Sequence, residues 1–211
     1  MNEIFPGVYQ KDDRIFTKAL DDKAVYGEKF VNGYRTWNPR RSKPCAAFLN
    51  GLKEFPIKQG DKILYLGAGN GTTASHLSDI VGLDGAIYCV EFSARTMREL
   101  MEVCERRKNM IPILADANYP AKYEYVDEVD VVYQDVAQKN QGEIFLTNCK
   151  EFLKKGGRGM LMIKSRSVDV VKDPEEIYEN VKDLISGELK IKEFLQLDPY
   201  ERDHCCFVIE N

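Results

Sequence analysis

A regular alternation of strand-like and helix-like segments after Gly60-Asp61 constrains the fold more than any other feature of this sequence. The strand-like segments are short, mainly apolar runs. The expected strands lie at 62–66, 86–90, 111–114, 129–133 and 158–163, and the expected helices at 72–80, 93–107, 142–153 and 174–185. Strands separated by helices of this length form βαβ units, so we expect a parallel sheet with right-handed crossovers.

The last part of the sequence breaks this alternation. Residues 190–197 and 205–210 both have strand character, and the segment between them must turn because no helix fits there. The two strands should therefore form an antiparallel hairpin. A doubly wound sheet that ends in such a hairpin is typical of class I S-adenosylmethionine-dependent methyltransferases, whereas a dinucleotide-binding domain usually ends with another parallel strand. We predict a Rossmann-like α/β fold with a seven-stranded sheet.

The first 55 residues have no helical period except near their end. Short strands are expected at 7–9, 14–17 and 34–37, separated by turn-forming pairs such as Asn32-Gly33. A short helix is expected from Lys43 through Leu52, with Ser42 as its cap. We therefore expect a small, mainly β domain at 1–55, followed by the methyltransferase domain at 56–211.

Composition excludes several classes of protein. With 44% hydrophobic and 30% charged residues, the chain resembles an ordinary globular protein, and no apolar run is long enough for a bilayer. The N-terminus lacks the pattern of a signal peptide, so we expect an intracellular, cytoplasmic protein without membrane contact. The six cysteines form no C-x-x-C pair and should be reduced, and with only two histidines no metal site is expected.

The net charge of −4 bears on possible partners. A protein that binds RNA alone usually has a basic surface, because neutralisation of phosphates supplies much of the affinity. Either this chain does not bind nucleic acid, or another molecule holds the nucleic acid for it. The net charge does not exclude a local basic patch.

A glycine-rich segment, Gly67-Ala68-Gly69-Asn70-Gly71, lies between an expected strand and an expected helix that opens with Thr72-Thr73. Glycines in this context allow a tight turn and a close approach of the backbone to a nucleotide. An ordinary glycine-rich turn and an NAD site remain alternatives. The spacing G-x-G-x-G, rather than G-x-G-x-x-G, favours an adenosyl-sulfonium ligand, which has no pyrophosphate.

Acidic residues follow three of the expected strands, where ligands bind in open parallel sheets. Each one alone could be a helix cap, but three at successive strand ends favour a ligand site. Glu91 would bond ribose hydroxyls, and Asp116 would accept a hydrogen bond from the adenine amino group. The predicted cofactor-binding residues are Gly67, Ala68, Gly69, Thr72, Thr73, Glu91, Phe92, Asp116, Ala117, Asp135 and Gln138.

Longer stretches of the sequence resemble the fibrillarin family. The similar segments lie at 34–43, 64–73, 75–82, 90–93, 135–138 and 199–204, in the family's order. They include Trp37-Asn38-Pro39-Arg40-Arg41-Ser42-Lys43 and Asp135-Val136-Ala137-Gln138. The glycine- and arginine-rich tail of eukaryotic members is absent, so the chain resembles the short archaeal form.

The resemblance implies transfer of a methyl group from S-adenosylmethionine to the ribose 2′-hydroxyl of rRNA, and of tRNA, within a box C/D guide RNA particle. A Nop-type scaffold protein and a kink-turn-binding ribosomal-type protein are the implied partners, beside the guide RNA and target RNA. Exposed aromatic residues are candidates for the docking surface of the scaffold, namely Tyr123, Tyr125 and Tyr178.

Related 2′-O-methyltransferases use a lysine–aspartate–lysine constellation, which corresponds here to Lys43, Asp135 and Lys164. Lys164 follows a buried strand and would be the base, with Asp135 orienting it and Lys43 keeping it neutral by like-charge repulsion. His204 is the expected fourth member, and Glu201 or Asp203 remain alternatives.

Two other functions remain open at this point. One is a methyltransferase with the same fold that acts on a small molecule or a protein. The other is a subunit that binds the cofactor without catalysis. The segment from Trp37 to Lys43 and the pair Asp135 and Lys164 argue against both, because they match enzymes that modify RNA ribose.

Overall fold

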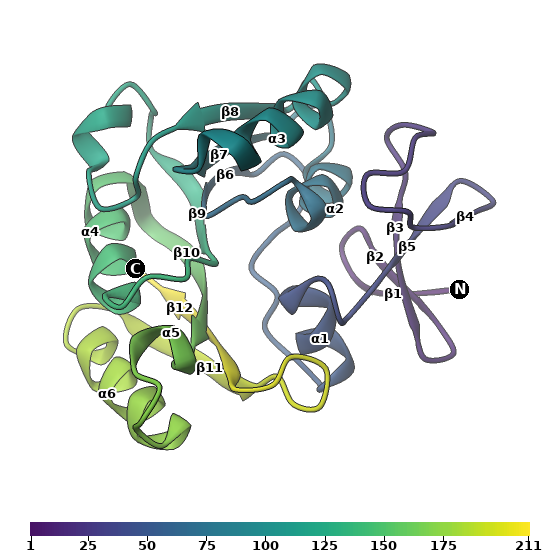
Figure 1. Cartoon of the computed structure of the whole chain (residues 1–211). Coiled ribbons are helices and arrows are strands. Elements are labelled where there is room, and N and C mark those ends of the chain that lie inside the picture. The colour runs from purple at the N-terminus through teal and green to yellow at the C-terminus, as the bar shows by residue number, and fades with distance from the viewer.

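The computed structural model describes residues 1–211, which form two β-sheets with helices around the larger one (Figure 1). The smaller sheet is N-terminal and antiparallel, with the strand order β1-β2-β3-β5-β4. Its strands are β1 (Asn2–Phe5), β2 (Val8–Lys11), β3 (Arg14–Lys18), β4 (Phe30–Val31) and β5 (Tyr34–Trp37).

The larger sheet has seven strands in the order β11-β12-β10-β9-β6-β7-β8. Its strands are β6 (Lys62–Leu66), β7 (Ala86–Glu91), β8 (Met110–Leu114), β9 (Val129–Gln134), β10 (Leu153–Lys164), β11 (Lys190–Gln196) and β12 (His204–Glu210). Strands β6 to β10 are parallel, and β12 runs antiparallel between β10 and β11. The predicted seven-stranded sheet with a terminal antiparallel hairpin is confirmed.

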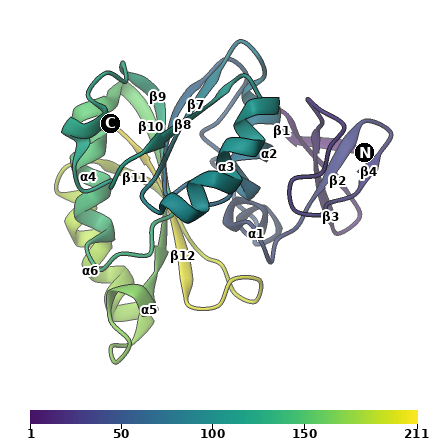
Figure 2. The same ribbon diagram turned by 45° about the horizontal axis from the view of Figure 1, so that its top comes forward.

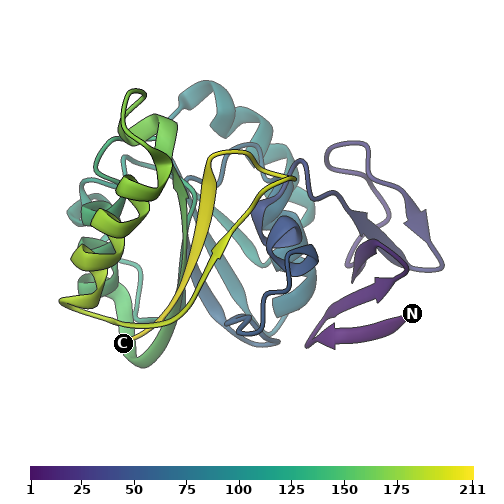
Figure 3. The ribbon, with the colours of Figure 1, turned by 90° about the horizontal axis from the view of Figure 1, so that it is seen from below.

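Helices cover both faces of this sheet (Figures 2 and 3). The helices are α1 (Lys43–Leu49), α2 (Thr72–Val81), α3 (Ala94–Arg106), the 3-10 helix η1 (Pro120–Tyr123), α4 (Gln141–Phe152), α5 (Ser165–Val168) and α6 (Pro174–Ser186). One apolar core lies between the sheet and α1 to α3, and it also takes in Val8, Ile15 and Trp37 of the smaller sheet. A second core lies between the sheet and α4 and α6.

Several expected boundaries were wrong for local reasons. Helix α1 ends at Leu49 rather than Leu52, because Gly51 takes the left-handed conformation (φ 88°) and closes the helix end. Ser42 does not cap α1 with its side chain, since its Oγ lies 2.8 Å from Thr73 Oγ1. Strand β10 begins at Leu153 rather than Arg158, and its register with β9 shifts between these residues. Four short elements had no clear signal in the sequence, namely the strands β1 and β4 and the helices η1 and α5.

Buried salt bridges and hydrogen bonds connect the smaller sheet to α2. Both Asp79 oxygens are used, since Arg35 on β5 and Arg107 after α3 each contact Asp79 at 2.7 Å. The hydroxyl of Thr17 on β3 donates to Asp79 at 2.7 Å. The Arg35 and Asp79 side chains are 0% exposed, so these charges depend on one another for the solvation that water would otherwise supply.

Two of the three tyrosines expected on a docking surface are buried, and that prediction was wrong for them. Tyr123 donates from its hydroxyl to Asn148 Oδ1 at 2.6 Å and stacks on Phe152. Tyr178 is 3% exposed and packs on Phe194. Only Tyr125 is exposed, at 68%. None of the helices combines the length and the apolar character that crossing a membrane requires.

Candidate functional site

The loop between β6 and α2 brings the backbone close to a neighbouring strand end. Gly67 has φ 80°, and a Cβ at this position would come within 2.4 Å of the Asp135 carbonyl oxygen. Only glycine fits there, for both the conformation and the contact. The N–H of Gly69 donates to Glu91 Oε2 at 3.0 Å, and the Ser93 N–H donates to Glu91 Oε1 at 2.8 Å. Glu91 therefore links the glycine loop to the start of α3.

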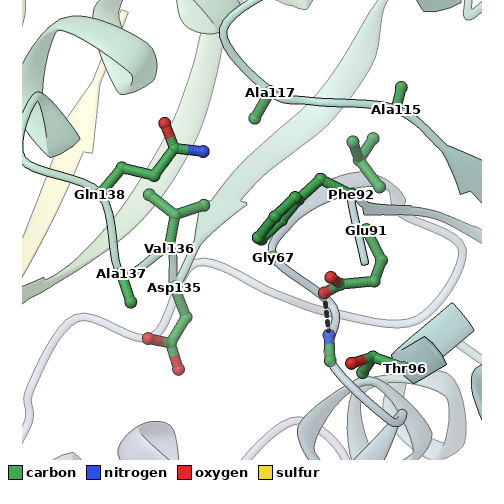
Figure 4. Close-up of a pocket in the computed structure, with 12 residues that line it drawn as sticks. Gly67, Glu91, Phe92, Thr96, Ala115, Ala117, Asp135, Val136, Ala137 and Gln138 are labelled. Carbon is green, nitrogen blue, oxygen red and sulfur yellow. Dashed lines mark hydrogen bonds between the residues drawn. The ribbon is translucent and has the colours of Figure 1, made fainter. Parts of the chain in front are cut away.

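A cavity of about 340 Å³ opens at the carboxyl ends of β6, β7, β8 and β9 (Figure 4). The exposed ring of Phe92 lies within the lining, beside Val136 and Glu91. The lining residues are Gly67, Gly69, Val90, Glu91, Phe92, Thr96, Ala115, Ala117, Asp135, Val136, Ala137 and Gln138. The site thus lies where the parallel sheet predicts a ligand.

The cavity contains seven of the predicted cofactor residues and omits four, namely Ala68, Thr72, Thr73 and Asp116. Thr72 Oγ1 donates to Asn70, and Thr73 Oγ1 contacts Ser42, so both hydroxyls are used locally. Sequence reasoning missed five lining residues: Val90, Thr96, Ala115, Val136 and Ala137. The adjacency of Val136 and Ala137 to Asp135 was an available signal, whereas Thr96 had none.

Asp116 lies beside the cavity and organises its wall. Its Oδ1 accepts hydrogen bonds from the Asn118 backbone and side chain, both at 2.9 Å, and from Gln138 Nε2 at 3.2 Å. Burial alone would raise the pKa of Asp116, but these hydrogen bonds outweigh it and hold the pKa below its usual value. Asp116 is therefore ionised near neutral pH, and Oδ2 makes no hydrogen bond within the chain.

Lys43 and Asp135 form an ion pair at the open side of this region. Lys43 Nζ donates to Asp135 Oδ2 at 2.7 Å, and both side chains are largely buried. Burial favours the neutral form of Lys43, but the charge and hydrogen bond of Asp135 outweigh it, so the pKa of Lys43 is raised. Lys43 therefore carries its charge throughout the neutral range.

Lys164 does not pair with Asp135, contrary to the expectation that Asp135 orients it. Its backbone is held instead, since Gln141 Oε1 accepts from the Lys164 N–H at 2.9 Å and Gln141 Nε2 donates to its carbonyl at 3.1 Å. Lys164 Nζ makes no ion pair with any carboxylate of the chain. The ion pair of Asp135 is formed with Lys43 instead, through Oδ2.

Glu201 and His204 on the terminal hairpin join these residues. Burial, together with the charge of Lys43, lowers the pKa of His204, so its imidazole is neutral near pH 7. Burial raises the pKa of Glu201 against the opposing charges of Lys43 and Lys164. Asp203 is paired differently, because its Oδ2 accepts from Arg166 Nε at 3.2 Å. The identity of the fourth member stays a prediction.

Comparison with known proteins assigns the family. The model of the family described as fibrillarin matches residues 1–211 of the chain.

The chain belongs to the fibrillarin family.

Individual fibrillarins are similar over nearly their whole length. A protein of Thermococcus onnurineus named fibrillarin-like rRNA/tRNA 2′-O-methyltransferase is 50% identical, with 97% of this chain and 96% of the relative covered. The structure of Aeropyrum pernix fibrillarin with natively bound S-adenosyl-L-methionine has a TM-score of 0.85 and 49% identity, covering 93% and 88% of the two chains. Fibrillarin in a fibrillarin/Nop5p complex has a TM-score of 0.94 and 44% identity, with 99% of each chain covered.

Proposed function

We propose that this chain transfers a methyl group from S-adenosylmethionine to the ribose 2′-hydroxyl of guide-selected nucleotides in rRNA and tRNA, as the catalytic subunit of a box C/D ribonucleoprotein. The observation that carries this proposal is the grouping of Lys43, Asp135, Lys164 and the hairpin residues Glu201 and His204. The names of the similar proteins support the same activity. Because rRNA and tRNA are made within the cell, the proposed activity is intracellular.

The cavity residues fit S-adenosylmethionine. The glycine loop provides a close backbone approach at Gly67, and Glu91 at the end of β7 offers a carboxylate for ribose hydroxyls. Asp116 offers its free Oδ2 to an amino group, and Phe92 offers an apolar face. When bound, S-adenosylmethionine supplies a methyl group already activated by its sulfonium, and the electrons of the broken carbon–sulfur bond stay on sulfur.

The chain's own residues must orient the ribose and remove its proton, since a protonated hydroxyl is a poor nucleophile. We assign proton removal to Lys164 Nζ, which has no carboxylate partner in the chain. The Lys43–Asp135 pair is fixed by its 2.7 Å contact, and the charges of Lys43, Asp135 and Lys164 all act on the pKa of Glu201 and of His204. Neutral His204 and Glu201 can position the ribose from the hairpin. With Lys43, Asp135 and Lys164, the site therefore takes residues from four separate parts of the chain.

RNA positioning is shared with other components in this proposal. A chain of net charge −4 gains little from counterion release over its surface as a whole. A Nop-type scaffold would dock the enzyme, and a kink-turn-binding ribosomal-type protein would anchor the guide RNA. The similar fibrillarin in the fibrillarin/Nop5p complex supports the first of these partners.

A methyl-transfer assay with components added one at a time tests the proposal. Labelled S-adenosylmethionine, target RNA, guide RNA and the two partner proteins are combined with this chain, and the modified nucleotide is mapped. We expect methylation only in the complete particle and only at the ribose that the guide selects. Methylation of a protein or small molecule, or site-specific RNA methylation by the isolated chain, would overturn the proposal.

A further inference from the structure

A second hollow lies beside the Trp37–Lys43 segment, which supplies four of its lining residues. Its volume is about 480 Å³, and only two of its ten lining residues are hydrophobic. The lining residues are Arg14, Tyr26, Gly27, Glu28, Lys29, Thr36, Trp37, Asn38, Pro39 and Arg41. They come from the smaller sheet and from the turn that leads into α1, a region beside the larger sheet in Figures 1 and 3.

The hollow has an excess of positive charge that the chain does not neutralise. Arg14, Lys29 and Arg41 are exposed, and none of them forms a salt bridge. The single carboxylate of the lining, Glu28, is already satisfied by Arg35 at 2.5 Å. Three unpaired cations around one polar hollow contrast with the net charge of −4 of the whole chain. The net charge of the sequence alone did not decide whether such a local basic patch exists.

Hydrogen bonds and stacking hold the wall of the hollow in place. The Tyr26 hydroxyl lies 2.7 Å from His76 Nε2, and the guanidinium carbon of Arg41 lies 5.3 Å from the centre of the Tyr26 ring. This is a cation–π contact, in which the face of the Tyr26 ring attracts the charged guanidinium group of Arg41. Trp37, stacked on His76, also lines the hollow, and its buried indole Nε1 has no hydrogen-bond partner. A buried donor without a partner calls for an acceptor.

The hollow is continuous with the catalytic segment. Arg41 lines it, Ser42 contacts Thr73 at the start of α2, and Lys43 pairs with Asp135. Two residues of extended chain span at most about 7 Å, so the Cα atoms of Arg41 and Lys43 are no farther apart than this, a distance similar to that between neighbouring nucleotides of an RNA strand. A strand whose ribose reaches the catalytic residues would therefore pass beside the hollow.

We propose that this hollow binds phosphate groups of the RNA strand that carries the reacting ribose, close to the reacting nucleotide. Guanidinium groups bind phosphate oxygens with two parallel hydrogen bonds, and Lys29 adds a point charge. The contacts are independent of base sequence, as an enzyme directed by a guide requires. This inference rests on the proposed function. It means that the enzyme itself contacts the target RNA within the particle.

The test compares two triple variants in the fully assembled particle. Arg14→Gln/Lys29→Gln/Arg41→Gln removes the cations of the hollow. Lys122→Gln/Lys150→Gln/Lys155→Gln removes the same number of exposed cations, also free of salt bridges, from elsewhere on the surface. The KM for target RNA and the salt dependence of target binding are measured for both. A third variant, Arg14→Lys/Lys29→Arg/Arg41→Lys, retains the charges.

We expect the first variant to raise the KM for target RNA about tenfold and to make the slope of log affinity against log salt shallower by about 2 to 3. The Kd for S-adenosylmethionine and the melting temperature should match wild type. The second variant should resemble wild type, and the charge-retaining variant should recover most of the binding. Thiouridine in the target strand near the modified site should cross-link to Tyr26.

Equal effects of the two neutralised variants would overturn the inference, because they would reflect bulk charge alone. An unchanged salt slope in the first variant, or cross-links only from the guide strand, would also overturn it. In each of these cases the wild-type particle still methylates its target. A wild-type particle that does not methylate the target would instead refute the proposed function.

Discussion

Lys43 and Asp135 lie 92 positions apart in the sequence and meet through a 2.7 Å hydrogen bond between Nζ and Oδ2. The contact joins α1, which follows the smaller sheet, to the end of β9 in the larger sheet. It therefore couples the packing of the two sheets to the geometry of the proposed catalytic residues.

The pairing predicts a pH-dependent stability. Asp135→Asn should lower the free energy of unfolding by about 1.5–3 kcal/mol at pH 7, because Lys43 loses a charged acceptor. The folded pKa of Lys43 is raised, so the wild-type advantage should be complete below the unfolded value of about 10.4 and disappear as the pH rises through the folded value. Urea unfolding from pH 7 to 11 measures this, with exposed Asp183→Asn as the control. The advantage should begin to decline above a pH of about 10.4, and an advantage that stays constant between pH 10 and 11 would exclude Lys43 as its source.

Lys164→Ala should reduce methyl transfer by about 10²–10⁴-fold, the usual effect of losing a general base. Cofactor binding should remain near wild type, because Lys164 does not line the cavity. Single-turnover methylation in the assembled particle and calorimetry with S-adenosylmethionine separate the two effects. Lys155→Ala, an exposed lysine on the same strand, is the matched control. Turnover within tenfold of wild type would rule out the assigned role.

Asp116→Ala should weaken S-adenosylmethionine binding by about 1.5–3 kcal/mol, the size expected for a hydrogen bond to a charged group. The variant also frees Gln138, which Asp116 holds against the cavity wall. Because the pKa of Asp116 is lowered, its contribution to stability should be present above the unfolded pKa and lost as the pH falls through the folded one. Calorimetry on a folded Asp116→Ala protein decides the point, and an unchanged Kd would refute the assignment.

Gly67→Ala should raise the Kd for S-adenosylmethionine by tenfold or more, equivalent to about 1.4 kcal/mol. The new Cβ would collide with the Asp135 carbonyl oxygen and displace the strand end. Gly60→Ala is the control, since Gly60 has φ 82° but no atom within 4 Å of its ideal Cβ. Both variants share the backbone strain of about 1–2 kcal/mol. Equal affinity of the two variants for S-adenosylmethionine would mean that the close approach of Gly67 to Asp135 does not affect cofactor binding.

Asp79→Asn should lower the free energy of unfolding by about 3–5 kcal/mol, because buried Arg35 and Arg107 both lose the charge of this carboxylate and keep only Glu28 and Asp21 as acidic partners. Exposed Asp127→Asn should change it by less than about 0.5 kcal/mol. Urea denaturation followed by circular dichroism gives both values. A small effect for Asp79→Asn would mean that water or other groups reach the two arginines.

The alternation of apolar strands and helices was sufficient to predict the larger sheet, because periodicity records which faces are buried. The carboxyl ends of its strands then located Glu91, Asp116 and Asp135 near one ligand site. Side-chain pairing was not predictable in the same way. Nothing local in the sequence indicates that Asp135 bonds Lys43 rather than Lys164, or that Tyr123 finds a buried partner in Asn148. Such choices depend on contacts between segments far apart in the chain.

The position of β12 between β10 and β11 has a consequence for synthesis on the ribosome. Strand β11 is translated before β12, yet its only neighbour in the sheet is β12. The nascent β11 therefore has no strand to pair with until β12 has left the exit tunnel. The turn that carries Glu201 joins these two strands, so its position in the proposed site depends on a pairing that needs the C-terminal strand.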